Sequence, residues 1–204
     1  MIPIVHDLEP REFTLFRQSK QILNVPDFDS LEFLPIKLII KEQLLQLQGG
    51  KCIYCERTFI DLSCFQVEHI KPKSGNNAHE NLCFDYNNYA ASCIQEESKR
   101  TRTCGQNKKD NLLYVEPTNP QCNDYYTLNT EGEINPLSTG TRRERHNLKA
   151  TLDILGLNKA HLVRLRKKRI DALIQLMKIN PSLAIKFIES GNFHFILKRL
   201  VQQP

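Results

Sequence analysis

Cys52-Ile53-Tyr54-Cys55 is the motif that most directly indicates the fold of this chain. Two thiolates at this spacing can bind one tetrahedral ion, but a closed structural site needs two further ligands. Cys93 and Cys104 are the best candidates, and we interpret the ten residues between them, 94–103, as a polar loop. The sequence therefore predicts a structural Zn²⁺ held by these four cysteines.

The cysteine count favours a metal over disulfides. The chain has seven cysteines, an odd number that excludes a complete set of intramolecular disulfide bonds. In a reducing compartment such clusters are more often zinc sites. A redox function is disfavoured because no strand–helix pattern of the thioredoxin type surrounds the pair. Four unrelated buried thiols remain the alternative, and we interpret Cys64, Cys83 and Cys122 as small core residues.

Between the two cysteine pairs lies Val67-Glu68-His69-Ile70-Lys71-Pro72-Lys73-Ser74. The histidine can deprotonate water, because its ordinary pKa lies near neutrality. The carboxylate can bind a hard divalent cation such as Mg²⁺, which prefers oxygen ligands. The lysines can contact phosphates. A lone Glu-His pair is weak evidence, but its position inside the cysteine cluster indicates phosphodiester chemistry.

Together these motifs carry a resemblance. Cys52-x-x-Cys55, Glu68-His69-Ile70-x-Pro72, Asp85-Tyr86-Asn87-Asn88, Cys93 and Cys104-Gly105-x-x-Lys108 resemble the HNH, or ββα-metal, nuclease motif. With Glu9-Pro10-Arg11-Glu12-Phe13, they are similar to the PtuB-like HNH proteins of retron and Septu anti-phage systems. The similarity covers most of residues 1–175, and its specific motifs lie in 9–13 and 52–110.

The resemblance implies a role for each matching residue. His69 matches the general base and Glu68 the acidic metal ligand, while Asn88 matches the asparagine that orients the histidine. Asn81 is the alternative to Asn88. The family usually has Asn or His directly after the last cysteine, where this chain has Gly105. We therefore expect the second ligand of the catalytic ion to be Asn107. Asp110 and His79 are less favoured.

The same resemblance implies single-metal hydrolysis. A catalytic Mg²⁺ or Mn²⁺ on Glu68 would neutralise charge on the phosphate, while the zinc would do no chemistry because four thiolates leave no open position. Lys71, Lys73 and Lys108 are candidate phosphate contacts, and a plain solubilising charge is the alternative for each. The family's partner is an ABC-type ATPase (PtuA-like), and a retron reverse transcriptase with its RNA–DNA product could join it.

The charge distribution adds a second candidate surface. The net charge of +5 is unevenly distributed. Residues 1–140 have 14 basic and 19 acidic side chains, a net charge of −5, whereas residues 141–204 have 14 basic and 4 acidic side chains, a net charge of +10. Arg164, Lys167 and Lys168 share one face of an expected helix. They favour binding to a nucleic-acid backbone, DNA or RNA, or to an acidic partner; a solvated helical face is the alternative.

We expect an α+β fold: a ββα-metal (HNH) nuclease core with a four-cysteine zinc site, embedded in helices and followed by a mainly helical region. Periodicity predicts a helix over 35–48, a strand, turn and strand over 113–135, and a helix capped by Thr141 and Glu144 and ended by Gly156. Asn158 would cap the next helix, and two short helices would follow. We expect three parts: an extended N-terminal segment over 1–34 that could contact a partner, a zinc-stapled nuclease core over 35–138 and a basic helical region over 139–204.

Composition excludes other classes. The hydrophobic fraction of 40% and charged fraction of 25% are typical of a globular protein. No stretch approaches the ~20 apolar residues of a membrane span, and no signal peptide is recognisable, so we expect a cytoplasmic location without membrane contact. The favoured function is a metal-dependent endonuclease, and the alternative is a non-catalytic zinc-stapled module that binds nucleic acid or a partner.

Overall fold

The computed structural model describes residues 1–94 and 101–201, so most of the polar loop expected over 94–103 lies outside the described residues. The helices are α1 (Arg11–Ser19), α2 (Leu34–Leu47), α3 (Cys104–Lys108), α4 (Arg142–Leu155), α5 (Ala160–Ile179), α6 (Pro181–Glu189) and α7 (His194–Val201). The strands are β1 (Phe65–His69), β2 (Tyr89–Cys93), β3 (Tyr126–Leu128) and β4 (Ile134–Pro136). Short 3-10 helices are η1 (Val25–Asp29), η2 (Leu62–Cys64), η3 (Glu80–Leu82) and η4 (Tyr86–Asn88).

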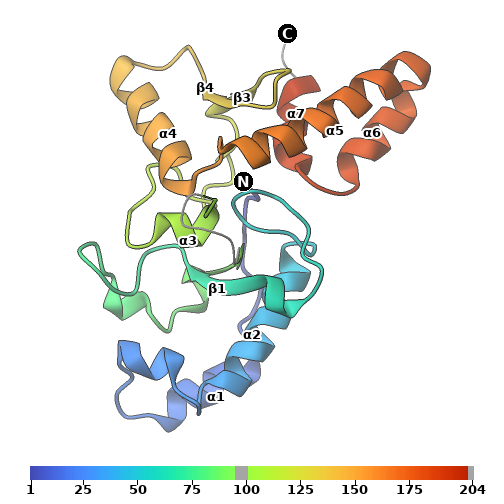
Figure 1. The fold of residues 1–204 in the computed structure, drawn as a ribbon. Helices are drawn as coiled ribbons and strands as arrows, with labels where there is room; N and C mark the ends of the chain where they lie inside the picture. Colours follow the sequence, from blue (N-terminus) through green and yellow to red (C-terminus); the bar gives the residue numbers. More distant parts are fainter. Residues whose placement is uncertain (95–100, 202–204) are drawn as a thin grey trace.

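The antiparallel pair β1–β2 lies at the centre of the molecule. Its register joins Phe65 to Cys93 at one end and His69 to Tyr89 at the other. Figure 1 shows α1 and α2 on one side of β1 and α4 to α7 on the other. The short helix α3 follows β2 and packs against it. Two strands and a helix around the cysteine cluster confirm the expected α+β fold of the ββα-metal type.

An aromatic core joins β1–β2 to the N-terminal helices. It contains Phe13 and Phe16 of α1, Phe33 before α2, and Tyr89 of β2. The expectation of an extended segment over 1–34 is therefore wrong for residues 11–19, which form α1. The helix is short and buries only Phe13 and Phe16, so its periodic signal is a single pair of aromatic residues.

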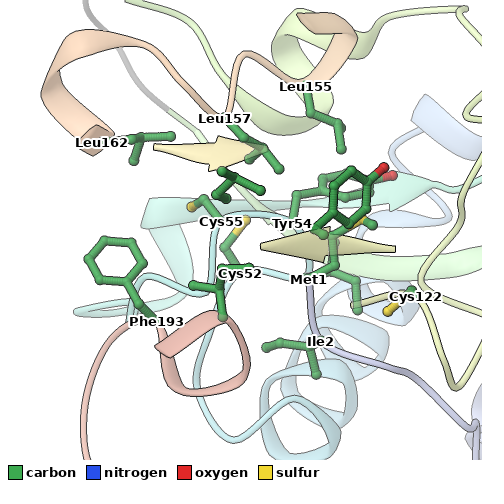
Figure 2. Close-up of a cluster of buried hydrophobic side chains, with 14 of the residues drawn as sticks. Met1, Ile2, Cys52, Tyr54, Cys55, Cys122, Leu155, Leu157, Leu162 and Phe193 are labelled. Atoms are coloured by element: carbon green, nitrogen blue, oxygen red, sulfur yellow. The ribbon is translucent and has the colours of Figure 1, made fainter. Parts of the chain in front are cut away.

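A second core encloses the cysteine cluster. Cys52 and Cys55 lie in it together with apolar residues of the segment 1–4, of β3–β4 and of α4 to α7. Figure 2 shows both cysteines among Leu157, Phe193 and other apolar side chains. This core unites residues from all three segments expected from the sequence, so the zinc-stapled unit and the basic helices share one interior.

The C-terminal half follows its sequence signals closely. The side chain of Thr141 accepts a hydrogen bond from the backbone N–H of Glu144, and the Glu144 carboxylate accepts one in return, so the capping box is confirmed. Gly156 ends α4 in the left-handed conformation at φ +63°. The expected strand–turn–strand is confirmed for β3–β4, although the first strand begins only at Tyr126.

The expected cap of α5 is wrong. The N-cap residue is Lys159, whereas Asn158 pairs with the backbone of β4: its Oδ1 accepts from Ile134 N (2.9 Å) and its Nδ2 donates to Ile134 O (2.7 Å). Within the described residues, no helix combines the length and apolar character needed to cross a bilayer.

Candidate functional site

His69 is the last residue of β1, and its ring is largely buried. Its exposed fraction is 7%, and its ring packs edge-on against Phe28 (4.5 Å between centroids) and Tyr89 (5.1 Å). Its Nε2 lies 3.0 Å from the backbone oxygen of Cys83. A carbonyl oxygen can only accept, so Nε2 carries the proton and the lone pair of the neutral ring is on Nδ1.

The surroundings of His69 keep the imidazole neutral. Burial among apolar rings lowers its pKa to about 4, because the charged imidazolium would lose its hydration. At neutral pH the ring therefore has an unprotonated nitrogen. That is the state which a general base requires.

Asn88 connects two neighbouring segments of the chain at the end of β1–β2 where His69 lies. Its Oδ1 accepts a hydrogen bond from Lys71 N (2.7 Å), and its Nδ2 donates to Lys71 O (2.9 Å) and Leu82 O (3.1 Å). Cys83, whose carbonyl orients His69, directly follows Leu82, so Asn88 fixes the segment that holds the imidazole. Asn81, the alternative, is exposed.

Glu68 lies beside His69 in sequence and is 5% exposed. Its Oε1 is 2.9 Å from the ammonium group of Lys108 and accepts a hydrogen bond from the hydroxyl of Tyr54 (3.3 Å). Its Oε2 accepts a hydrogen bond from the Gln66 amide (3.3 Å). The carboxylate is therefore held from several directions while it lines the same cavity as His69.

Gly105 leaves space that Glu68 fills. A Cβ atom at this position would lie 2.1 Å from Glu68 Oε2, which is far closer than atoms can approach. The backbone N–H of Gly105 donates to Ser92 Oγ (3.0 Å), which holds α3 against β2. Gly105 stands where the resembling family has Asn or His. The carboxylate of Glu68 thus occupies the space that such a side chain would need.

Two sequence-based assignments on α3 are corrected. Asn107 does not face Glu68: its Nδ2 donates to Ile154 O (2.8 Å) at the end of α4, and its Oδ1 accepts from Lys159 (3.1 Å). Lys108 is 1% exposed and paired with Glu68, so a phosphate cannot reach it. Periodicity does not identify the inward face of so short a helix.

A cavity of about 730 Å³ runs along β1. In the described part of the chain β1 pairs only with β2, so the other edge of β1 has no partner strand. All five residues of β1 line the cavity along that edge. Asp110, the second choice for a metal ligand, also lines it. Phe28, Asp29, Lys37 and Lys41 are among the lining residues that sequence reasoning missed. Their distance along the chain from the motif left no local signal.

The remaining candidate phosphate contacts lie elsewhere. Lys73 lines the cavity, but Lys71 is paired with Glu116 (2.7 Å) and is not among the lining residues. Arg164, Lys167 and Lys168 lie on α5 and do not line the cavity either.

The four cysteines form a closed cluster. The Sγ atoms of Cys52, Cys55, Cys93 and Cys104 all lie within 4.8 Å of one another, and all four residues are buried. Burial raises the pKa of Cys52 and Cys104, because several thiolates cannot coexist in an apolar interior without a cation. Arg57 supplies only one positive charge, donating hydrogen bonds to Cys55 and Cys93 (3.5 Å each). The donor set fits a tetrahedral Zn²⁺.

No family model matches the sequence. The chain is 48% identical over 205 residues to a protein of Vibrio cholerae serotype O1 biovar El Tor, "Retron Vc95 putative HNH endonuclease". The alignment covers 98% of this chain and 99% of that protein. The likeness therefore includes the cysteine cluster, the hairpin and the C-terminal helices.

Proposed function

The chain belongs to the retron HNH endonucleases, and from this premise we propose that it hydrolyses phosphodiester bonds with His69 as general base. The observation that carries this proposal is the orientation of the imidazole. Its Nε2–H donates to Cys83 O, which leaves Nδ1 free of a proton on a ring that lines the cavity. In the reaction, Nδ1 would take a proton from the attacking water, and Asn88 would hold the loop that positions the ring.

The oxygen donors along β1 support a catalytic divalent cation. Glu68 lines the cavity with its Oε2 beside Gly105, and the amide of Gln66 lies next to that oxygen. Asp110 offers a further carboxylate in the same cavity. These hard ligands fit Mg²⁺ or Mn²⁺, which would stabilise charge on the phosphate and on the departing 3′-oxygen. Lys108 would keep Glu68 in place.

The partner assignment rests on the family. We propose an ABC-type ATPase of the PtuA kind as the partner, in an anti-phage defence role, with the retron reverse transcriptase and its RNA–DNA product as further components. The sequence has no Gly-x-x-x-x-Gly-Lys-Ser/Thr motif, so ATP hydrolysis in such an assembly would come from another chain. Exposed apolar side chains near the N-terminus, including Leu8 and Leu31, are compatible with a partner contact.

The direct test is a His69→Ala protein, assayed on DNA and RNA with Mg²⁺ or Mn²⁺, alone and with an ABC-type ATPase of the proposed kind. Loss of the general base should lower the rate about 10²- to 10⁴-fold. His146→Ala, which removes an exposed histidine of α4, is the matched control and should cleave normally. Full cleavage by His69→Ala would remove the proposed base.

The alternative is a zinc-stapled module that binds without cutting. The observation in its favour is the buried pair of Glu68 and Lys108, in which one carboxylate oxygen already has a cationic partner. Wild-type protein that binds nucleic acid but leaves it intact under every metal condition, with its ATPase present, would establish this alternative.

A further inference from the structure

The cavity along β1 is rich in lysines although residues 1–140 carry a net negative charge. Among the described residues, Lys37 and Lys41 of α2 line it together with Lys73 and Lys109. None of the arginines and lysines of α5 does so. The basic groups that line the cavity with His69 thus come from residues 1–140. The net charge of that part of the chain is negative and gives no indication of them.

Two of these lysines are fixed against each other. Lys37 and Lys73 reach the same carboxylate, that of Asp29, at 2.8 and 2.6 Å. Both ammonium groups also lie over the ring of Phe28, at 4.1 and 4.2 Å from its centroid, in the geometry of a cation–π contact. The carboxylate and the ring therefore hold both charges near the same point of the cavity.

This arrangement is connected to the proposed catalytic base. Phe28, which lies under both lysines, packs edge-on against His69 at 4.5 Å. Lys41 follows Lys37 by one turn of α2, and its ammonium group lies over Phe65, the first residue of β1, at 4.6 Å. The positive charges therefore extend along β1 from the position of the imidazole.

Asp29 occupies the place of an anionic ligand. Its side chain is 66% exposed, while those of Lys37 and Lys73 are 18% and 20% exposed. Desolvation by burial opposes ionisation of Asp29, but the two lysines hold its pKa below the ordinary value. An anion that enters the cavity can displace this exposed carboxylate and meet two cations that are already in position.

We propose that Lys37 and Lys73, with Lys41 beyond them, form a subsite for the sugar–phosphate backbone of the nucleic acid next to the bond that is cut. This proposal rests on the proposed function. The ligand is a phosphodiester group, contacted through its charge and not through its bases. Phe28 keeps both lysines in position, and the α5 lysines bind no substrate phosphate at this site.

The test is a binding titration with full-length protein carrying His69→Ala, which should slow cutting about 10²- to 10⁴-fold. Fluorescence anisotropy with labelled single-stranded DNA and RNA gives Kd over a series of salt concentrations. In that background Lys37→Gln/Lys73→Gln should weaken binding about tenfold or more, and the dependence of log K on log salt should become shallower by about 1 per lysine. The matched control, Lys178→Gln/Lys186→Gln, removes two exposed lysines of α5 and α6 that lie outside the cavity, and it should leave both quantities unchanged.

Folding of the double variant is checked by zinc content and by its thermal unfolding. Lys37→Arg/Lys73→Arg, which keeps both charges, should restore most of the binding. Unchanged binding by Lys37→Gln/Lys73→Gln, an equal loss of binding in the control variant, or no binding by the His69→Ala protein itself would overturn the subsite. Failure of the proposed function is a separate result: wild-type protein would bind through Lys37 and Lys73 but cut nothing.

Discussion

The cysteine cluster and the cavity along β1 are built on one hairpin but differ in almost every physical respect. The cluster is closed, apolar in its surroundings and composed of four soft ligands, with Cys93 at the end of β2. The cavity is open along the free edge of β1 and lined by carboxylates, lysines and one imidazole. A metal in the first region can stabilise the fold but cannot meet a substrate.

Substitutions in the two regions should therefore have different effects. Changes in the cluster should remove structure, and activity with it. Changes in the cavity should alter activity or binding at a smaller cost in stability. Glu68 links the two regions, because it lies in the cavity while its ion pair with Lys108 is buried.

Loss of a cluster ligand should have the largest effect. Cys52→Ser should abolish binding of about one zinc ion per chain and unfold the hairpin, since zinc supplies folding free energy on the order of 10 kcal/mol. Metal analysis and circular dichroism measure the two losses. Cys64→Ser, which changes a less buried thiol outside the cluster, should keep both zinc and fold. Wild-type protein without zinc, together with a normally folded Cys52→Ser, would contradict the division between the two regions.

Breaking the ion pair that links them should have the next largest effect. Lys108→Met leaves the Glu68 carboxylate buried without its cation and should lower the free energy of unfolding by about 3–5 kcal/mol. Denaturant titration measures the change, with the exposed Lys109→Met as control.

The double variant Glu68→Leu/Lys108→Met separates stability from function. Because it removes both charges, it should recover most of the lost free energy of unfolding. It should still not cleave nucleic acid, because no carboxylate remains at position 68. A double variant as unstable as Lys108→Met alone would show that packing, and not charge, explains the loss.

The sequence predicted those features that short spacing encodes. The cluster follows from Cys52 and Cys55 with two later thiols, whereas His69 and Asn88 were identified through the resemblance to the HNH motif. Helices with strong periodicity or clear caps were also predicted within a few residues. These features depend on local geometry, which the order of residues describes directly.

The features that sequence reasoning missed depend on long-range packing. Phe28 lies in a 3-10 helix far from the motif in sequence, and only the aromatic core brings it onto His69. Asn107 resembled a ligand by its position, but α3 turns it towards α4. Arg166 is part of the basic run on α5, yet it is 1% exposed and donates to Gly132 O and Leu157 O. Composition does not distinguish such an internal arginine from a surface one.

Gly105 tests how closely the two regions are fitted together. Gly105→Asn places a side chain where Glu68 Oε2 now lies, and overpacking of this kind costs about 1–3 kcal/mol. The shift of Glu68 should also reduce cleavage. Glu68→Asp/Gly105→Asn, which shortens the acid as it adds the amide, should recover part of both quantities. Equal stability of Gly105→Asn and wild type would show that the carboxylate is not confined there.

Acidification should give an effect of at most similar size, and it concerns the cavity alone. Burial lowers the pKa of His69 to about 4 in the folded protein, whereas an unfolded chain has a histidine pKa of about 6.5. Below pH 6.5 the unfolded state therefore binds more protons than the folded state, and this contribution to stability falls with pH until about pH 4. From pH 7 to pH 5 the wild type should lose about 2 kcal/mol more than His69→Asn. Denaturant titrations of both proteins at each pH isolate the contribution of the imidazole to the free energy of unfolding, since protonation of the cysteines affects the two proteins equally. Identical losses would mean that the ring is solvated in the folded state, and the argument that burial keeps the base neutral would no longer hold.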